Sequence, residues 1–334
     1  MGRPSDASQP ASVRSGVTTL RGTPSREHGG SKVLRCTGCR NAYGGDRMIV
    51  LPGRRFGVSS LMDVPRLLRS LTVAFSGDVD HMIDAARDHD WERHHRFGQK
   101  WSARVLDVTK TRLEVVGLEH IDPHESYVVA SLHESFADAL ALLQLPLPLA
   151  WVARDELADW NRLDVFLETE AAITLSPEQP VRAMRTLLVE APAVFDSGRS
   201  LVVFPQGTLL GVETAFSAGA FRVADRFQRP LLPVVITGSH LVYEYPFSPR
   251  VRFGETIRME ILPPRQAGRA VAEMSKVVRL VREIALSAQP APRRFRPARD
   301  GYWDGYAYDI APEFAELASE VAAHRRGAEG TDVA

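Results

Sequence analysis

The chain has 334 residues and a formal net charge of zero, because 41 lysines and arginines balance 41 aspartates and glutamates. This length is ample for one large domain, or two smaller ones, with a buried core. A neutral chain lacks the overall positive field with which a protein attracts nucleic acid, so we expect no nucleic-acid partner.

Cysteine content and hydropathy restrict the class further. Cys36 and Cys39 are too few for a disulfide scaffold; they could form half of a zinc site, but no second pair follows. No apolar run reaches the 18 residues of a transmembrane helix, and the N-terminus lacks the apolar core of a secretory signal. We expect a cytoplasmic protein, with association at the inner face of the membrane left open.

Residues 1–55 are rich in Arg, Ser, Gly and Pro, and carry ten basic residues against three acidic ones. This composition predicts a disordered basic tail. Such a tail either contacts anionic lipid headgroups or stays solvated without a partner.

Residues 56–110 predict an N-terminal pair of amphipathic helices. The first begins at Asp63, which can cap it, with Pro65 in its first turn. Its apolar residues follow helical spacing: Val64, Leu67, Leu68, Leu71 and Phe75. The second helix spans Val79 to about Leu106. This pair lies either on a membrane surface or against the main domain. Three histidines of this region are expected to be exposed: His89, His94 and His95.

Between residues 111 and 290 short apolar segments alternate with helical patterns. Strands are expected at Leu113–Val116, Tyr127–Leu132, Leu147–Ala153, Leu201–Phe204, Leu231–Thr237 and Arg252–Leu262. Helices are expected at Pro180–Phe195, Ala218–Phe227 and Arg269–Ala288. Apolar strands without alternation, separated by helices, are typical of an α/β fold. We therefore expect a mostly parallel sheet flanked by helices on both faces.

Residues 291–334 contain an aromatic segment, Tyr302–Tyr308, and a final helix from about Pro312 to His324. The aromatic segment either lines a ligand tunnel or seals the core. We favour core packing, because aromatic side chains at the end of a domain usually pack.

His133 and Asp138 are the first candidates for catalysis. The histidine follows a predicted strand and the aspartate opens the next predicted helix. Ligand crevices of open α/β sheets form at such strand ends. A carboxylate there can hold one imidazole nitrogen and leave the other free as a general base.

A second candidate group, Phe204-Pro205-Gln206-Gly207-Thr208, also follows a buried strand. Gly207 lets the backbone approach a ligand closely, and Gln206 and Thr208 offer hydrogen-bonding groups. The group contains neither a nucleophile nor a base. It is either a loop that binds and orients a ligand or a plain strand-to-helix turn.

These blocks occur in a fixed order with three others. The others are Arg154-Asp155-Glu156-Leu157, Phe216-Ser217-Ala218-Gly219-Ala220-Phe221 and Pro230-Leu231-Leu232-Pro233-Val234-Val235. The ordered set, over roughly residues 110 to 262, resembles the glycerolipid acyltransferase family. The resemblance implies that His133 is the general base, oriented by Asp138. It implies substrate binding by Arg154, Phe204, Pro205, Gln206, Gly207 and Thr208. The acyl donor, coenzyme A or acyl carrier protein, would be a co-substrate; no resident cofactor or metal is implied.

Three departures from the family pattern concern the acceptor. Gln206 replaces the family's Glu, Leu209 replaces its Arg, and Ala171–Pro177 lacks the Arg that meets the acceptor phosphate. Leucine cannot replace a bidentate arginine–phosphate contact. Arg182 and Arg185 either compensate or form a solvated helix face. We therefore expect acyl transfer to a lysophosphatidate-like acceptor or to a lipid or metabolite without a phosphomonoester.

Two other classes remain open. One is a non-catalytic relative that binds lipid or acyl carrier protein, which the altered acceptor blocks make plausible. The other is a metal hydrolase built on the histidines, which lack the spacing of metal ligands.

Overall fold

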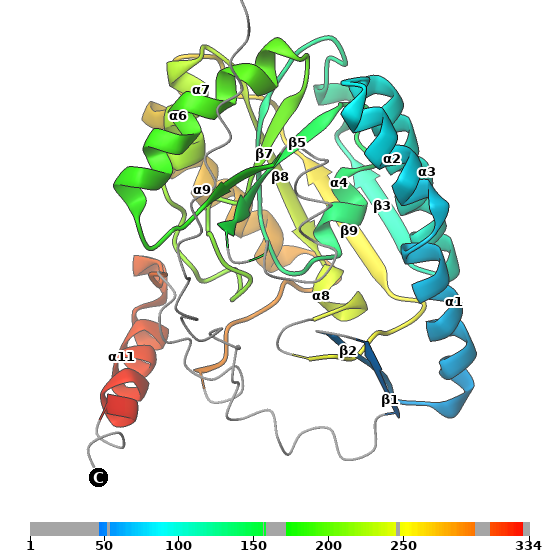
Figure 1. The fold of residues 1–334 in the computed structure, drawn as a ribbon. Helices are drawn as coiled ribbons and strands as arrows, with labels where there is room; N and C mark the ends of the chain where they lie inside the picture. Colours follow the sequence, from blue (N-terminus) through cyan, green and yellow to red (C-terminus); the bar gives the residue numbers. More distant parts are fainter. Residues whose placement is uncertain are drawn as a thin grey trace, which may run out of the picture. The chain divides into compact units, whose positions relative to one another are not determined.

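The computed structural model describes residues 47–51, 54–155, 157, 172–244, 248–297 and 308–329 (Figure 1). The chain divides into two units, residues 1–35 and residues 36–334, and all described residues belong to the second. Cys36, Cys39, Glu156 and residues 302–307 of the aromatic segment lie outside the described residues.

A β-hairpin precedes the helices. Strand β1 (Arg47–Leu51) pairs antiparallel with β2 (Arg54–Val58). Phe56 and Val58 are buried, and the Phe56 ring stacks on Tyr243 at 5.6 Å between centroids. The hairpin corrects the predicted tail, whose limit at residue 55 lies inside β2. Burial of two apolar side chains next to three arginines explains why composition alone missed it.

Three helices, and not two, follow the hairpin. They are α1 (Val64–Ala74), α2 (Gly77–Arg87) and α3 (Trp91–Val108). The predicted second helix breaks at His89, which has a left-handed φ of 55°. Asp90 then caps α3 by accepting a hydrogen bond from the Arg93 amide at 3.0 Å.

The three helices pack against the main domain. This is one of the two arrangements that the sequence left open. Trp101 of α3 donates its indole hydrogen to the Ala74 carbonyl at 3.2 Å, and Val105 and Leu106 are buried against the sheet. His94 and His95 are also buried, so the prediction that they are exposed was wrong. Both histidines lie on the face of α3 that packs inward, whereas Glu92 and Arg96 of the same helix are exposed.

The described residues form a seven-stranded sheet in the order β3-β9-β8-β4-β7-β5-β6. The strands are β3 (Arg112–Val116), β4 (Val128–Ser131), β5 (Leu149–Arg154), β6 (Ile173–Leu175), β7 (Ser200–Val203), β8 (Leu231–Thr237) and β9 (Thr256–Ile261). The five strands from β8 to β6 are parallel, whereas β9 runs antiparallel to β8 and β3 runs parallel to β9. The predicted mostly parallel α/β sheet is confirmed.

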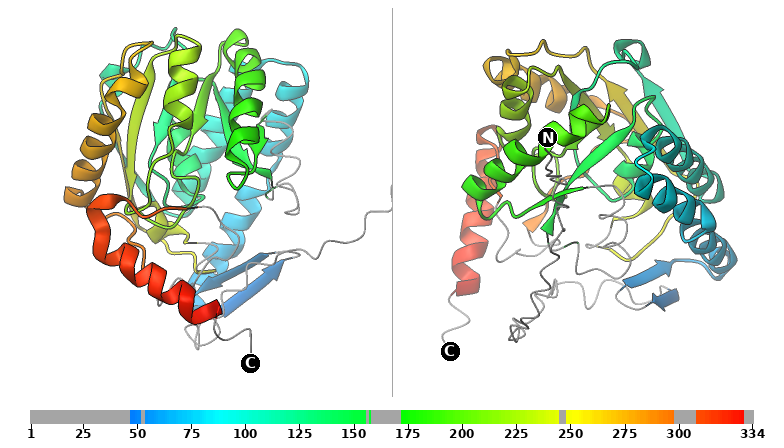
Figure 2. Two further views of the ribbon diagram at one scale, coloured as in Figure 1. Left: turned by 90° about the vertical axis from the view of Figure 1, so that its left-hand side faces the viewer. Right: turned by 45° about the horizontal axis from the view of Figure 1, so that its top comes forward.

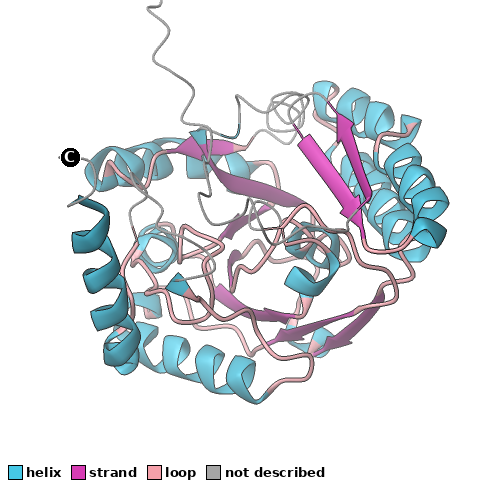
Figure 3. Ribbon diagram, turned by 90° about the horizontal axis from the view of Figure 1, so that it is seen from below, coloured by secondary structure: helices cyan, strands magenta, loops and turns pink. Residues whose placement is uncertain are grey.

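Helices cover both faces of the sheet (Figures 2 and 3). On one face lie α6 (Pro180–Asp196), α7 (Gly219–Arg226) and α9 (Ala270–Ser287), each within one residue of its predicted bounds. On the other lie α3 and the short α4 (Asp138–Leu142). No helix of the described part combines the length and apolarity needed to cross a bilayer.

The C-terminal segment returns to the carboxyl ends of the parallel strands. The Val212 amide donates to the Arg293 carbonyl at 3.1 Å, and the Ala311 amide donates to the Glu213 carbonyl at 2.8 Å. A 3-10 turn (Pro312–Phe314) and α11 (Ala315–Glu329) follow. Tyr308, the one described residue of the aromatic segment, packs edge-on against Phe295 in an apolar cluster.

Candidate active site

His133 and Asp138 meet at the end of β4. The imidazole Nδ1 lies 2.6 Å from Asp138 Oδ2, and the same oxygen accepts hydrogen bonds from the amides of Glu134 at 2.8 Å and Ser135 at 3.0 Å. Asp138 is fully buried, while the His133 side chain is partly exposed. A carboxylate held in this way places the proton on Nδ1 and leaves Nε2 as the basic nitrogen.

Phe204 packs flat against the imidazole. The two rings lie 3.7 Å apart between centroids, at 13° between planes, and Trp151 stacks behind Phe204 at 6.5 Å. The stack fixes the plane of the histidine ring. In the described structure this residue of the predicted binding loop therefore contacts the candidate base.

The side chain of Gln206 supports the same histidine through hydrogen bonds. Its Oε1 accepts a hydrogen bond from the His133 amide at 3.1 Å, and its Nε2 donates to the Gly211 carbonyl at 2.7 Å and to Thr214 Oγ1 at 2.6 Å. The side chain is only 5% exposed. A glutamate, which cannot donate, could not make the contact to Gly211. Gln206 thus positions the base by bonds within the protein.

The remaining residues of the loop differ in how their polar groups are bonded. The Gly207 amide donates to the Phe204 carbonyl at 2.9 Å. Pro205 is buried, and its carbonyl accepts from the Ser217 amide at 2.8 Å. Thr208 Oγ1 is buried without a hydrogen-bond partner among the described residues. Such a hydroxyl is costly unless a ligand satisfies it.

Arg154 brings one positive charge to this loop. It ends β5, donates from Nη1 to the Gly207 carbonyl at 3.2 Å and pairs through Nη2 with Glu178 at 2.6 Å. Leu209, at the position of the family's arginine, packs into the apolar cluster of Leu210 and Phe295. The leucine therefore serves packing against the C-terminal segment.

Arg182 and Arg185 lie on the exposed side of α6. Arg182 approaches Gln179 Oε1 at 3.4 Å. Nothing among the described contacts brings either arginine to His133, so their compensating role stays a prediction.

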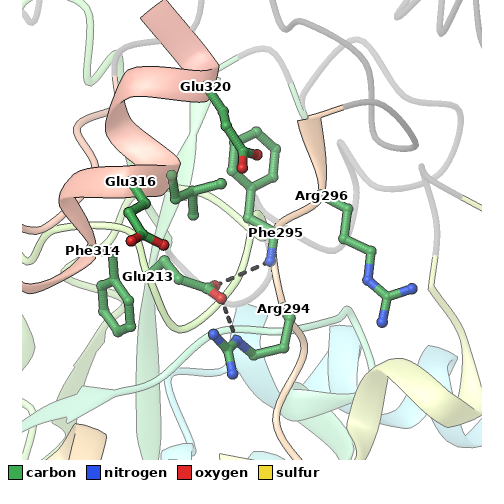
Figure 4. Close-up of a pocket in the computed structure, with 8 residues that line it drawn as sticks. Glu213, Arg294, Phe295, Arg296, Phe314, Glu316 and Glu320 are labelled. Atoms are coloured by element: carbon green, nitrogen blue, oxygen red, sulfur yellow. Dashed lines mark hydrogen bonds and ion pairs between the residues drawn. The ribbon is translucent and has the colours of Figure 1, made fainter.

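A cavity of about 430 Å³ lies elsewhere, between the loop at Glu213, the C-terminal segment and α11 (Figure 4). Arg294 and the Phe295 amide both bond the Glu213 carboxylate at its wall. None of the predicted site residues lines this cavity. Within the described residues, no three His, Cys, Asp or Glu side chains are grouped so as to hold a metal ion.

The sequence patterns did not indicate the residues that support the loop of the candidate base from other parts of the chain. Thr214 receives the Gln206 amide, and the Ser135 hydroxyl bonds the Tyr243 carbonyl. These partners lie 8 and 108 residues apart in the chain, so no local spacing indicates them.

Comparisons with known proteins agree with the resemblance. Residues 112–237 match the Acyltransferase family model. A human 1-acyl-sn-glycerol-3-phosphate acyltransferase alpha is 33% identical over 140 residues, covering 38% of this chain and 46% of that protein. The chain thus spans less than half the length of this relative. A 1-acyl-sn-glycerol-3-phosphate acyltransferase of Pseudomonas aeruginosa is 29% identical over 183 residues, covering 53% of this chain and 68% of the relative.

A solved structure shows the same fold. The 1-acyl-sn-glycerophosphate acyltransferase of Thermotoga maritima aligns with a TM-score of 0.53 at 20% identity, covering 67% of this chain and 97% of that one. The matched region contains His133, Asp138 and the Phe204–Thr208 loop. Residues 112–237 of the α/β domain thus match the Acyltransferase family model, and the chain is similar in sequence to 1-acyl-sn-glycerol-3-phosphate acyltransferases.

Proposed function

We propose that the protein transfers an acyl group from a thioester, on coenzyme A or acyl carrier protein, to a hydroxyl of an acceptor lipid or metabolite. The observation that carries this proposal is the 2.6 Å contact between His133 and Asp138 in a domain that matches this family model. The donor is a co-substrate, so the reaction needs no resident cofactor.

The proposed reaction is one acyl transfer without an acyl-enzyme. Nε2 of His133 takes the proton of the acceptor hydroxyl as its oxygen attacks the thioester carbonyl. The tetrahedral intermediate expels the thiolate as the carbon–sulfur bond breaks, and the imidazolium returns the proton to sulfur. Asp138 stabilises the charged ring, and Thr208 Oγ1 is the buried donor suited to the developing oxyanion.

The acceptor is proposed to lack a phosphomonoester. The relatives are named for acylation of 1-acyl-sn-glycerol 3-phosphate. Here Leu209 is committed to apolar packing and Arg154 already contacts Glu178 and the Gly207 carbonyl. A glycolipid, a lysophospholipid with a headgroup or a specialised metabolite would place less demand on arginine than a phosphate dianion does.

We propose that the first helices contact a membrane surface peripherally. Large apolar side chains are exposed at the 3-10 turn Leu61–Asp63 and along α1: Leu61, Met62, Leu68 and Phe75. Arg66 and Arg69 are exposed on the same helix. Exposed apolar residues with neighbouring arginines suit the interface of an anionic bilayer.

A screen of acyl donors and acceptors, read by mass spectrometry with heat-inactivated protein as the blank, tests the proposal. We expect thioester consumption matched by an acylated product, with lysophosphatidate and glycerol phosphate as poor acceptors. Rapid acylation of lysophosphatidate would contradict the proposed acceptor class and leave the transfer intact. If no thioester is consumed with any acceptor, the transfer itself is wrong and the protein is a non-catalytic binding relative.

A further inference from the structure

Glu134, the residue after the candidate base, is a buried carboxylate that the proposed reaction does not use. Its side chain is 1% exposed. Oε2 accepts hydrogen bonds from the Gly238 amide at 3.0 Å and from His240 Nδ1 at 2.8 Å, and Oε1 accepts one from the Arg293 amide at 2.7 Å. The donors lie 104, 106 and 159 residues further along the chain.

The turn after β8 is shaped to meet this carboxylate. Gly238 has a left-handed φ of 85°, and a Cβ there would lie 2.4 Å from the Thr256 carbonyl oxygen. Only glycine therefore lets the backbone pass so close and aim its amide at Glu134. The short helix α8 (Ser239–Val242) begins at this turn and presents His240, whose side chain is 14% exposed.

Without these hydrogen bonds, the buried carboxylate of Glu134 would destabilise the fold. Burial raises the pKa of the Glu134 carboxyl, and the hydrogen bond from His240 acts against that rise. A carboxylate in such a place needs its donors, since an unpaired buried charge strongly destabilises a folded protein. The chain thus contains a second histidine–carboxylate pair, one residue from the first.

The bonds of Glu134 complete the support of the loop 133–138. Asp138 accepts hydrogen bonds from two backbone amides of this loop. Gln206, which follows β7, accepts one from the His133 amide. Glu134 fastens the same loop to the end of β8 and to the C-terminal segment. Arg293, whose amide reaches Glu134, also bonds the Leu210 carbonyl with its side chain, so one segment joins both parts of the site.

We propose that Glu134 and His240 are a positioning pair for the acyl transfer: they hold the loop so that His133 stays in register with Asp138. This inference rests on the proposed function. The pair does not touch the reacting atoms in this account. His240 acts as a hydrogen-bond donor and not as a second base.

The test uses four variants of the full chain. Glu134→Gln turns an amide NH₂ toward at least one of the three donors, and His240→Ala removes one donor. His240→Asn retains a side-chain N–H close to the position of Nδ1. Glu190→Gln, at an exposed position on α6, is the matched control. For each variant kcat, KM and the melting temperature are measured with the best donor and acceptor of the screen.

We expect Glu134→Gln and His240→Ala to lower kcat by about tenfold or more, because a small misplacement of the base is enough, with KM changed less than about threefold. His240→Asn should restore most of the rate, and Glu190→Gln should behave as the wild type. Wild-type kcat in folded Glu134→Gln and His240→Ala would overturn the proposal. So would a folded His240→Asn as slow as His240→Ala, because His240 would then act by ionising.

A readout independent of catalysis separates this proposal from the proposed function. The proton between His133 Nδ1 and Asp138 should give a far-downfield NMR signal in the wild type, and Glu134→Gln and His240→Ala should broaden or lose it. If the wild type transfers no acyl group, but shows the signal and the two variants broaden or lose it, the positioning role stands and the proposed function fails. An unchanged signal in both variants would contradict the positioning role. If Glu134→Gln does not fold, the two His240 variants decide.

Discussion

At the scale of single residues, the support of His133 depends on an amide where the family pattern has a carboxylate. Gln206 accepts from the His133 amide with its oxygen and donates to Gly211 and Thr214 with its nitrogen. A glutamate would keep the first bond and could receive a redirected Thr214 hydroxyl. The Gly211 carbonyl would then lose two of its three described donors and keep only the Thr214 amide.

The change Gln206→Glu should therefore harm this protein, although it restores the family residue. We expect a loss of about 1–3 kcal/mol in the free energy of unfolding, measured by urea denaturation, and a lower kcat. Gln266→Glu, the same change at an exposed position, is the control. A Gln206→Glu variant as stable and as active as the wild type would show that the amide is not needed.

Substitutions of Thr208 should affect stability and activity differently. Its hydroxyl is buried without a partner in the described structure, so Thr208→Val should leave the free energy of unfolding unchanged or slightly higher. The same variant should lose about 10²-fold or more in kcat, if the hydroxyl stabilises the oxyanion. Thr208→Ser, which keeps the hydroxyl, should retain most of the rate. Full activity in Thr208→Val would exclude the hydroxyl from the reaction.

At the scale of elements, α3 carries a buried histidine whose protonation opposes folding. Burial, and then the neighbouring His94, lower the pKa of His95 from 6.5 to about 4. The unfolded chain takes up a proton as the pH falls below 6.5, while the folded chain resists until about pH 4. Stability from this group is thus fully present above pH 6.5 and is lost toward pH 4, by at most about 3 kcal/mol.

The variant His95→Gln should flatten this part of the stability curve. Urea denaturation between pH 7 and pH 4 is the measurement. His124→Gln, at an exposed histidine, should keep the slope of the wild type. An unchanged slope in His95→Gln would mean that another group controls the acid limb.

The elements also show how far sequence patterns reach. Apolar spacing predicted α6, α7 and α9 nearly to the residue, because their buried stripes are continuous. It missed the break between α2 and α3, because the polar run Arg87–Asp90 contains no Gly or Pro and the turn is made by a left-handed His89. It placed His133 and Asp138 correctly at a strand end and a helix start, where a local pattern exists. Glu134 and Gln206 were missed as positioning residues because their partners are distant in the chain.

At the scale of the whole described unit, the sheet separates the side that carries α1 from the side that carries α6. The apolar residues exposed on α1 lie with the helices of one face, and α6 lies on the other. If the α1 side contacts lipid, a charge there should weaken binding to anionic vesicles. Leu68→Glu should reduce co-sedimentation severalfold and leave transfer to a water-soluble acceptor unchanged. Val189→Glu, at an exposed apolar residue of α6, should bind as the wild type does; equal binding by both variants would contradict the assignment.

The central claim is that His133 is the base of an acyl transfer. The most direct test compares the wild type with His133→Ala for kcat/KM of product formation, on the donor and acceptor that the screen selects. The exchange affects a partly exposed side chain, so the variant should fold, as its melting temperature will show. We predict a loss of about 10²–10⁴-fold, the usual contribution of a general base. A folded His133→Ala protein that transfers acyl groups at the wild-type rate would contradict the account.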